Sequence, residues 1–361
     1  MSKIMVGLSG GVDSSVAASR LLEAGHRVTG LFMKNWEEDD TPDHCTAAED
    51  LEDAQEICKL LGIELKTINF SHEYWDRVFR IFLHEYRSGR TPNPDIVCNR
   101  EIKFKEFLEW AVGLGADCIA TGHYARLEKE NGHYNLLKGL DRNKDQSYFL
   151  YALDQQALGR VHFPVGDMTK DAVRARAREL SLPVHDKKDS TGICFIGEKR
   201  FADFLKRYLP SEPGEILTLD GETVGRHQGA WYYTIGQRQG LGIGGGGEPW
   251  YVARKDVRRN VIYAVQGKDH PALLKTRLVA EQLNWIRGIP PDAPLDCTAK
   301  TRYRQPDQRC AISGIVPGCA EVAFESPQWG VAAGQSIVFY HDDICIGGGV
   351  IRHAYNQRDN P

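Results

Sequence analysis

The sequence predicts an α/β protein in which a doubly wound parallel sheet is followed by small β domains. Two observations predict this order. In the first half, short apolar runs alternate with stretches whose apolar residues recur at i, i+3 and i+4, which is the pattern of strand–helix units. From about Pro210 onward, glycine and proline become frequent, helical periodicity fades and short β-type runs replace it.

The composition limits the class of protein. A chain of 361 residues is long enough for two or three domains. No apolar run approaches the length of a membrane span, and because the chain goes straight into a strand we expect no secretory or transit peptide. The nine cysteines contain no Cys-x-x-Cys pair, which argues against a disulfide scaffold or zinc ribbon and suits a reducing cytoplasm. At a net charge of −4, a nucleic-acid partner needs local basic patches.

The first strand, Ile4–Leu8, leads into Ser9-Gly10-Gly11-Val12-Asp13-Ser14 and a helix that runs to Ala24. The two glycines permit a sharp turn, so several backbone N–H groups and a helix N-terminus point at one place, which suits a phosphate chain. The serines add hydroxyl donors, and Asp13 can cap the helix or hold a magnesium ion. The structural alternative is an ordinary strand–turn–helix with two convenient glycines.

No Lys follows these glycines, so the loop is not the Gly-x-x-x-x-Gly-Lys-Ser/Thr nucleotide loop. The Ser-Gly-Gly-x-Asp-Ser pattern instead resembles the PP-loop of ATP pyrophosphatases. Enzymes of that superfamily split ATP into AMP and pyrophosphate while they adenylate a substrate.

The further elements of the first half alternate in type. We expect strands at Val28–Met33, Leu65–Phe70 and Asp117–Thr121, and helices at Ala47–Leu61, at Ser71 to about Ser88, around Phe104–Val112 and from near Thr169. Ligands of such sheets sit beyond the carboxyl ends of the strands, where the Ser9–Ser14 loop, Met33 and Thr121-Gly122-His123 all fall. Asn131-Gly132 predicts a hairpin inserted on the same side.

The second half is predicted to be β-rich. The candidate strands are Trp231–Ile235, Trp250–Ala253, Val261–Val265, Thr298–Tyr303, Ala320–Phe324 and Ser336–Tyr340. Gly240–Gly245 matches Gly-x-Gly-x-x-Gly, but neither a strand before it nor a helix after it is expected, so we interpret it as a surface loop. The predicted domains are residues 1–205, 206–275 and 276–361.

Two cysteines stand out as candidate nucleophiles. Cys98 closes a proline-stiffened loop in which Asp95 is placed to cap the next helix, and a helix N-terminus favours a thiolate. Cys194 lies in a glycine-flanked loop behind Lys187 and Lys188, where a thiol can be exposed and electropositive. The alternative for both is a small packed hydrophobe. The remaining seven cysteines are interpreted as structural or incidental: Cys45, Cys58, Cys118, Cys297, Cys310, Cys319 and Cys345.

Ordered motifs over essentially the whole chain identify a family resemblance. The chain is similar to the bacterial tRNA-specific 2-thiouridylases. The motifs are Gly7-Leu8-Ser9-Gly10-Gly11-Val12-Asp13-Ser14, Asn93-Pro94-Asp95-x-x-Cys98-Asn99, Ala120-Thr121-Gly122-His123-Tyr124, Lys144-Asp145-Gln146-Ser147, Ser190-Thr191-Gly192-x-Cys194-Phe195, Tyr233-Thr234-Ile235-Gly236-Gln237-Arg238 and Arg302-Tyr303.

The resemblance implies a substrate, a site and a fold. It implies 2-thiolation of the wobble uridine in the tRNAs for Glu, Gln and Lys, with ATP and Mg²⁺ at the Gly7–Ser14 loop and Met33 and Gly122 near the adenosine. It implies that the last domain is a β-barrel. Asn93, Pro94 and Asp95 would receive the base, Cys194 would carry a persulfide, and Cys98 would close a disulfide with it. The residues that would touch the tRNA elsewhere are His123, Lys144, Asp145, Gln146, Arg302, Tyr303 and Gln335.

The implied chemistry is consistent with the residues. Adenylating the uracil O2 oxygen makes it leave as AMP, so a persulfide sulfur, or hydrosulfide freed from it, can add at C2. The uridine has to leave its stack, and the thiols have to bring their Cα atoms within roughly 7 Å, so we expect the Ser190–Gly197 loop to move. The sequence leaves open whether Asp95 is a base or only positions the uridine. We expect a monomer supplied by a persulfide relay protein that a cysteine desulfurase feeds.

Two rival functions remain open at this point. A PP-loop ligase that forms amides would share the Ser9–Ser14 loop but need neither cysteine nor the β domains. A non-catalytic RNA-binding protein would bind tRNA and release no pyrophosphate, and the intact loop and the two cysteine motifs argue against it. The absence of Cys-x-x-Cys argues against the iron–sulfur tRNA thiolases.

Overall fold

The first half of the chain forms a five-stranded parallel sheet in the order β3-β2-β1-β4-β7. The computed structural model describes residues 1–37, 46–189 and 204–357. The strands are β1 (Lys3–Gly7), β2 (Arg27–Lys34), β3 (Leu65–Asn69), β4 (Cys118–Ala120) and β7 (Val161–His162). The strand order reverses between β1 and β4, so the crevice that binds ligands in such sheets opens there. The predicted doubly wound parallel sheet is confirmed.

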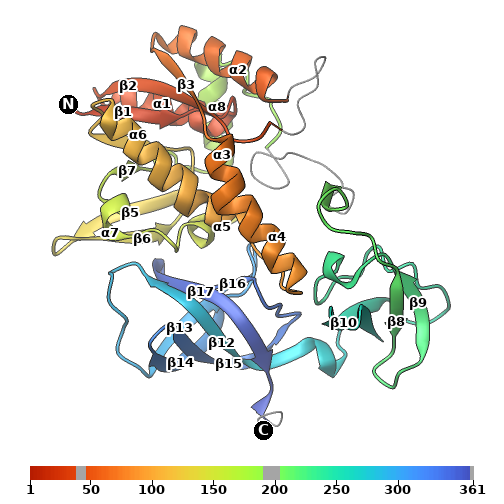
Figure 1. Ribbon diagram of the computed structural model, residues 1–361. Coiled ribbons are helices and arrows are strands. Elements are labelled where there is room, and N and C mark those ends of the chain that lie inside the picture. Colours follow the sequence, from red (N-terminus) through yellow and green to blue (C-terminus); the bar gives the residue numbers. More distant parts are fainter. Residues whose placement is uncertain (38–45, 190–203, 358–361) are drawn as a thin grey trace.

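Helices cover this sheet (Figure 1), and they form where the sequence predicts helices. Around the nucleotide loop lie α1 (Val12–Glu23), α2 (Thr46–Leu61) and α8 (Lys170–Glu179). A continuous helix of three segments, α3 (Ser71–Tyr74), η1 (Trp75–Phe79) and α4 (Arg80–Arg87), runs from the sheet toward the β-rich half. A second one joins α5 (Pro94–Cys98), η2 (Asn99–Glu106) and α6 (Phe107–Gly113). Shorter helices are η3 (Ser147–Phe149) and α7 (Gln155–Leu158).

The predicted hairpin is present, and it does not join the parallel sheet. Strands β5 (Ala125–Glu130) and β6 (His133–Lys138) pair antiparallel across Asn131 and Gly132, whose φ values are 50° and 83°. These dihedrals fit the primed turn that an Asn-Gly pair favours. The β6 strand pairs instead with the last strand of the protein, through Leu136 with Cys345 and Leu137 with Ile344.

The C-terminal region is a closed six-stranded antiparallel barrel. Its strands are β12 (Leu274–Trp285), β13 (Leu295–Lys300), β14 (Gln308–Val316), β15 (Cys319–Trp329), β16 (Ser336–His341) and β17 (Ile344–Tyr355). The order is β12-β15-β14-β13-β16-β17, and β12 also pairs with β17, which closes the ring. Closure removes the exposed strand edges that open sheets present. The expected β-barrel is therefore confirmed.

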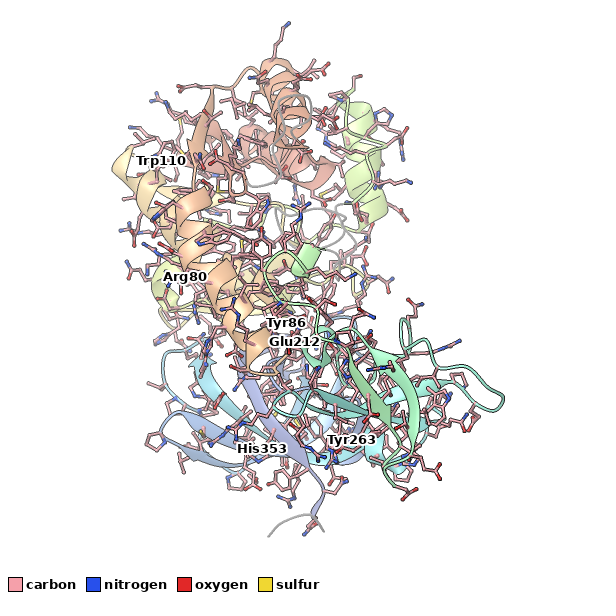
Figure 2. All side chains as sticks on the ribbon, turned by 45° about the vertical axis from the view of Figure 1, so that its right-hand side comes forward. Arg80, Tyr86, Trp110, Glu212, Tyr263 and His353 are labelled. Atoms are coloured by element: carbon pink, nitrogen blue, oxygen red, sulfur yellow. The ribbon has the colours of Figure 1, made fainter. Side chains whose placement is uncertain are left out.

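Along the chain, between the parallel-sheet half and the barrel, lies a four-stranded sheet in the order β10-β11-β8-β9. Its strands are β8 (Gly214–Leu217), β9 (Thr223–His227), β10 (Trp250–Asp256) and β11 (Val261–Gln266). The Gly240–Gly245 stretch has no helix or strand, as expected for a loop. Figure 2 gives a labelled residue in each region, among them Trp110 on α6, Arg80 on α4, Tyr263 on β11 and His353 on β17.

Two predicted strands are wrong in whole or in part. Trp231–Ile235 contains the 3₁₀ turn η4 (Ala230–Tyr232), because the Tyr232 and Tyr233 N–H groups bond the Gly229 and Ala230 carbonyls rather than a neighbouring strand. The strand predicted at Thr298–Tyr303 stops at Lys300, where the Thr301 N–H turns to the Gln305 side chain. The domain limits at 205 and 275 stay predictions. In the described part of the chain, no helix is long and apolar enough to cross a membrane.

Candidate nucleotide and tRNA site

The Ser9–Ser14 loop connects β1 to α1 at the point where the strand order reverses. Gly11 caps α1 without a side-chain hydrogen bond, which, within the described residues, leaves N–H groups of the first turn for a ligand. Gly10 has φ 68°, a backbone conformation that favours glycine. The Ser14 hydroxyl donates to the Gly11 carbonyl over 3.1 Å and accepts from the Ser9 N–H over 3.3 Å. These features fit a phosphate chain.

Gly122 forms the opposite wall of this crevice. A Cβ atom at Gly122 would lie 2.7 Å from the Ser14 backbone nitrogen and 2.8 Å from the Asp13 carbonyl carbon. Only a residue without a side chain therefore lets the β4 loop approach the first turn of α1 this closely. Met33, at the carboxyl end of β2, has its Cε atom 3.4 Å from the position of a Cβ on Gly7. The structure thus brings Gly7, Met33 and Gly122 together with the loop, as their order along the strands predicts.

A network of charges holds Asp13. The Lys170 ammonium donates to both Asp13 carboxylate oxygens, over 2.7 and 2.8 Å, and the Tyr124 hydroxyl donates to Oδ1 over 2.6 Å. Lys170 also pairs with Asp189 at 2.6 Å, and Asp189 pairs with Lys144 at 2.5 Å. Burial raises the pKa of Asp189, but hydrogen bonds from Lys144 and Lys170 outweigh this and hold it at about 2. Asp189 is therefore an anion at neutral pH.

Lys187 clamps the outside of the same loop. Its ammonium donates to the Gly10 carbonyl over 3.0 Å and pairs with Asp50 at 2.7 Å and with Asp53. Burial lowers the pKa of Lys187, but the two carboxylates outweigh burial and raise it above its ordinary value. A fixed cation at the loop backbone holds the turn in place for phosphate binding.

The sequence did not identify Lys170, Tyr124 and Asp189 as parts of the nucleotide site. Lys170 lies 157 residues from Asp13 along the chain, so no local pattern joins them. One signal was available: Lys170 follows Thr169, which caps α8 through its hydroxyl, and helix starts gather at this edge of the sheet.

The loop expected to receive the base lies at the start of α5. The helix cap is Asn93, whose side chain accepts from the Asp95 N–H over 3.2 Å, so the prediction that Asp95 caps the helix is wrong. An asparagine in extended conformation one residue before Pro94 supplies the acceptor, and Asp95 then sits within the first turn. Cys98 is the last residue of α5 and is fully buried. Cys194 lies outside the described residues, so no distance joins it to Cys98.

The barrel contacts this loop directly. The Gln335 side-chain amide donates to the Thr91 carbonyl over 2.8 Å, and the Thr91 N–H donates to the Ala333 carbonyl over 2.8 Å. The Thr91 hydroxyl lies 3.2 Å from that of Thr234 in the central region. Three parts of the chain therefore meet two residues before Asn93, and the predicted tRNA residue Gln335 is among them.

Arg302 and Tyr303 follow the carboxyl end of β13, a strand of the barrel. The ring of Tyr303 is 4.4 Å from that of Phe149, whose carbonyl accepts from the Asn99 side chain over 3.1 Å. Arg302 donates to the Ile235 carbonyl over 2.9 Å and to the Gly330 carbonyl. Burial lowers the pKa of Arg302. Arg302 therefore links the barrel to the central region through its guanidinium.

The residues Lys144, Asp145 and Gln146 have different surroundings. Asp145 is 4% exposed, and its carboxylate accepts from the Gly139 and Ser147 N–H groups, each over 3.1 Å. The Gln146 side chain accepts from the Tyr124 N–H over 2.9 Å, while Lys144 reaches Asp189. The side chains of Asp145 and Gln146 thus fix the local backbone, and the Lys144 cation joins the Asp13 network.

His123 is a buried residue of the same region. Its Nδ1 lies 2.7 Å from the Thr121 hydroxyl, and its ring packs against Phe104 and Phe163. Burial and the nearby Lys103 charge lower the pKa of His123 well below 6.5, so the imidazole is neutral at pH 7.

Comparison with known proteins agrees with this division of the chain. A model described as the tRNA methyl transferase HUP domain matches residues 2–198. The tRNA methyl transferase PRC-barrel domain matches residues 202–266, and the aminomethyltransferase beta-barrel domain matches residues 275–351.

Curated relatives match nearly the whole chain. A protein of Marinomonas sp. is 57% identical over 359 residues, covering 98% of this chain and 92% of its own length. One of Methylococcus capsulatus is 58% identical, covering 98% and 97%, and one of Klebsiella pneumoniae is 57% identical, covering 97% and 96%. All three are named tRNA-specific 2-thiouridylase MnmA.

Solved structures are more distant. A 4-thiouridine synthetase–RNA complex with bound ATP is 18% identical with a TM-score of 0.36, over 54% of this chain and 45% of that chain. The NMN synthetase from Francisella tularensis is 21% identical with a TM-score of 0.32, over 52% of this chain and 66% of that chain.

Proposed function

Because the chain belongs to the family of tRNA-specific 2-thiouridylases, and is therefore a tRNA-modifying sulfurtransferase, we propose that it thiolates the wobble uridine of the tRNAs for Glu, Gln and Lys. The observation that carries the proposal is that one half of the chain holds both the loop that suits phosphates and the loop expected to receive the base. The phosphate-binding turn at Ser9–Ser14 and the Asn93–Asp95 loop both lie on elements of the parallel-sheet half, and the barrel and central region brace the second loop at Thr91.

The nucleotide half of the reaction would use the loop between β1 and α1. The first-turn N–H groups of α1 and the Ser9 and Ser14 hydroxyls would bind the ATP phosphates. Asp13 is the carboxylate at the loop, and one or two carboxylates with substrate phosphates are the usual Mg²⁺ site, so Asp13 would hold the ion when it exchanges its Lys170 contact. Bound Mg²⁺ would neutralise charge on the leaving pyrophosphate.

The base half of the reaction would take place at the start of α5. The uridine O2 oxygen attacks the α-phosphorus, the bond to pyrophosphate breaks, and O2 becomes part of an AMP leaving group. Asp95, one residue inside the first turn, would contact the uracil and orient its O2. Once the uridine has left its stack in the RNA, this loop can reach the edge of the base that stacking hides.

Sulfur would arrive as a persulfide on Cys194. Cys98 would attack the Cys194 sulfur, the persulfide S–S bond would break, and hydrosulfide would leave as a Cys98–Cys194 disulfide forms. The hydrosulfide adds at C2 and AMP departs, which gives 2-thiouridine. A thiol reductant would then restore both cysteines, and a relay protein would reload Cys194. The full burial of Cys98 would protect it from other oxidants between turnovers.

The experiment combines Mg·ATP, unmodified glutamate tRNA and a persulfide donor labelled in its terminal sulfur. Pyrophosphate release and label in the tRNA are followed for the wild type, Cys98→Ser and Cys194→Ser. Cys319→Ser, at a half-buried cysteine of the barrel, is the matched control. We expect the Cys194 variant to release pyrophosphate without labelling the tRNA, and the control to match the wild type.

Other outcomes distinguish the rivals. Pyrophosphate release without label, unaffected by any cysteine substitution, would show an amide-forming ligase. The family models carry descriptions of methyl transfer, so a parallel reaction with a labelled methyl donor is included. Methyl label in the tRNA, with no tRNA-dependent pyrophosphate release, would overturn the thiolation proposal.

A further inference from the structure

A basic hollow lies away from the nucleotide loop, where the end of α4 meets the turn between β10 and β11. It measures about 410 Å³ and is lined by Ser88 and Gly89, by residues 254–259 and by Tyr263, which Figure 2 labels. The end of β10 and the turn after it contribute four cationic side chains, on Arg254, Lys255, Arg258 and Arg259, and one carboxylate, on Asp256. This excess of positive charge stands on a chain whose net charge is −4.

Three of these cations have their charge available. Among the described residues, no ion pair or side-chain hydrogen bond is formed by Arg254, Arg258 or Arg259, and all three are exposed. The Arg254 guanidinium lies 3.9 Å from the centre of the Tyr263 ring, which orients it without neutralising it. The Asp256 carboxylate instead accepts from the backbone N–H of Arg259 over 3.0 Å.

Lys255 stabilises the β10–β11 turn through a hydrogen bond to the central region. Its ammonium donates to the Tyr233 carbonyl over 2.7 Å and is thereby tied to the central sheet. Most arginines of the parallel-sheet half are used differently, since Arg20, Arg77 and Arg80 each pair with a carboxylate. Unpaired guanidiniums around one hollow are the pattern that binds the oxygens of phosphodiesters.

The hollow is close to the loop expected to receive the base. Gly89 lines it, and Asn93 lies four residues further along the chain, so their Cα atoms are at most about 14 Å apart. A stacked strand rises about 3.4 Å per nucleotide, so roughly four nucleotides cover that distance. RNA seated with a base at Asn93 therefore has phosphates within reach of the turn.

We propose that the end of β10 and the turn after it, through Arg254, Arg258 and Arg259, bind the phosphate backbone of the tRNA within about four nucleotides of the modified uridine. This rests on the proposed function in one respect, which is that the RNA is held at the Asn93 loop. The contacts position the RNA and read no base, so they contribute affinity that falls with salt.

The test measures the affinity of the full-length protein for unmodified glutamate tRNA from 50 to 300 mM KCl. The variant is Arg258→Ala combined with Arg259→Ala, two exposed side chains in a turn, whose folding is checked by thermal unfolding. Arg27→Ala, an exposed arginine at the opposite edge of the parallel sheet from the nucleotide loop, is the matched control. Arg254→Lys keeps the charge and removes the planar group.

We expect the double variant to bind about three- to tenfold more weakly per arginine at low salt, with a salt slope reduced by about 2. The control keeps the wild-type slope, and Arg254→Lys keeps the slope with a smaller loss of affinity. At saturating tRNA the rate of pyrophosphate release stays that of the wild type, because no residue of the nucleotide loop is changed.

A double variant with the slope of the wild type would overturn the proposal. The proposed function fails separately: wild-type protein that binds tRNA with this salt dependence and never thiolates it keeps the backbone contact and loses the thiolation.

Discussion

Lys170 supports the nucleotide loop through the Asp13 carboxylate. It lies between two carboxylates, Asp13 and Asp189, and bonds both. Replacing it with methionine leaves these anions without the cation between them, and their repulsion displaces Asp13 from the first turn of α1. We expect Lys170→Met to lower the rate of tRNA-dependent pyrophosphate release by about 10- to 100-fold, which corresponds to ~1.4–2.7 kcal/mol.

Steady-state release of pyrophosphate, with kcat and KM for ATP determined separately, is the measurement. Lys188→Met is the control, because Lys188 is exposed and adjacent to the Lys187 clamp. A Lys170→Met enzyme within twofold of the wild type would show that Asp13 does not need the Lys170 ammonium.

The sequence predicted the loop and missed its support for a physical reason. The turn at Ser9–Ser14 is a local pattern, and its meaning follows from backbone geometry within six residues. The supporting residues Lys170 and Asp189 come from α8 and the segment after it, far along the chain, and the packing of α8 against α1 brings them to Asp13. Asp95 illustrates a smaller limit. Asn93 and Asp95 lie two residues apart, and Asn and Asp are equally good caps, so the sequence does not show which of them caps α5.

At the level of elements, the β5–β6 hairpin depends on its turn. Gly132 has φ 83°, and nothing lies within 4 Å of a Cβ at that position. Gly132→Ala therefore costs backbone strain alone, and we expect it to lower the free energy of unfolding by about 1–2 kcal/mol. Urea denaturation monitored by circular dichroism measures this change.

Gly113 provides the control for that experiment. It is the last residue of α6, has no positive φ and also has open space around a Cβ. Gly113→Ala should raise the free energy of unfolding by roughly 0.5–1 kcal/mol, because alanine favours helix. Equal destabilisation by both substitutions would show that the positive φ of Gly132 does not set the cost of the substitution.

Long helices and the first strands were predicted because their periodicity is local and sustained. The α3–α4 helix and the α5–α6 helix keep an apolar face for many residues, so both form where the sequence predicts them. Each nevertheless contains a π-helical segment, η1 and η2, which the periodicity does not predict. The strand prediction at Trp231–Ile235 failed because four aromatic or apolar residues and one threonine fit a strand or a turn equally well. Whether a strand or a turn forms depends on which carbonyls accept from the backbone N–H groups, here those of Gly229 and Ala230.

For the whole molecule, the parallel-sheet half and the barrel are joined by the Lys138 side chain. Lys138 is 4% exposed, pairs with Asp307 at 2.5 Å, donates to the Asp342 carbonyl over 2.8 Å and lies over the Tyr340 ring. We expect Lys138→Met to lower the free energy of unfolding by about 1–3 kcal/mol, because Asp307 loses its nearest cation and the Asp342 carbonyl loses its donor.

Denaturation in urea checks this value against Lys129→Met, an exposed lysine on the partner strand of the same hairpin. That control should change the free energy of unfolding by less than about 0.5 kcal/mol. Equal midpoints for the two variants would show that the hairpin is held by strand pairing alone. The sequence predicted the hairpin, but its attachment to β17 requires residues some 200 positions away, which periodicity does not reveal.

That attachment has a consequence for the nascent chain. The edge of β6 is complete only when Ile344 and Cys345 have been synthesised, roughly 200 residues after Leu136 and Leu137. At about 5–20 residues per second, translation leaves this edge open for ~10–40 s. An unpaired strand edge invites pairing with another chain, so ribosome-bound copies of the first half are the form of this protein most exposed to aggregation. The last strand to be synthesised, β17, is the one that pairs with β6.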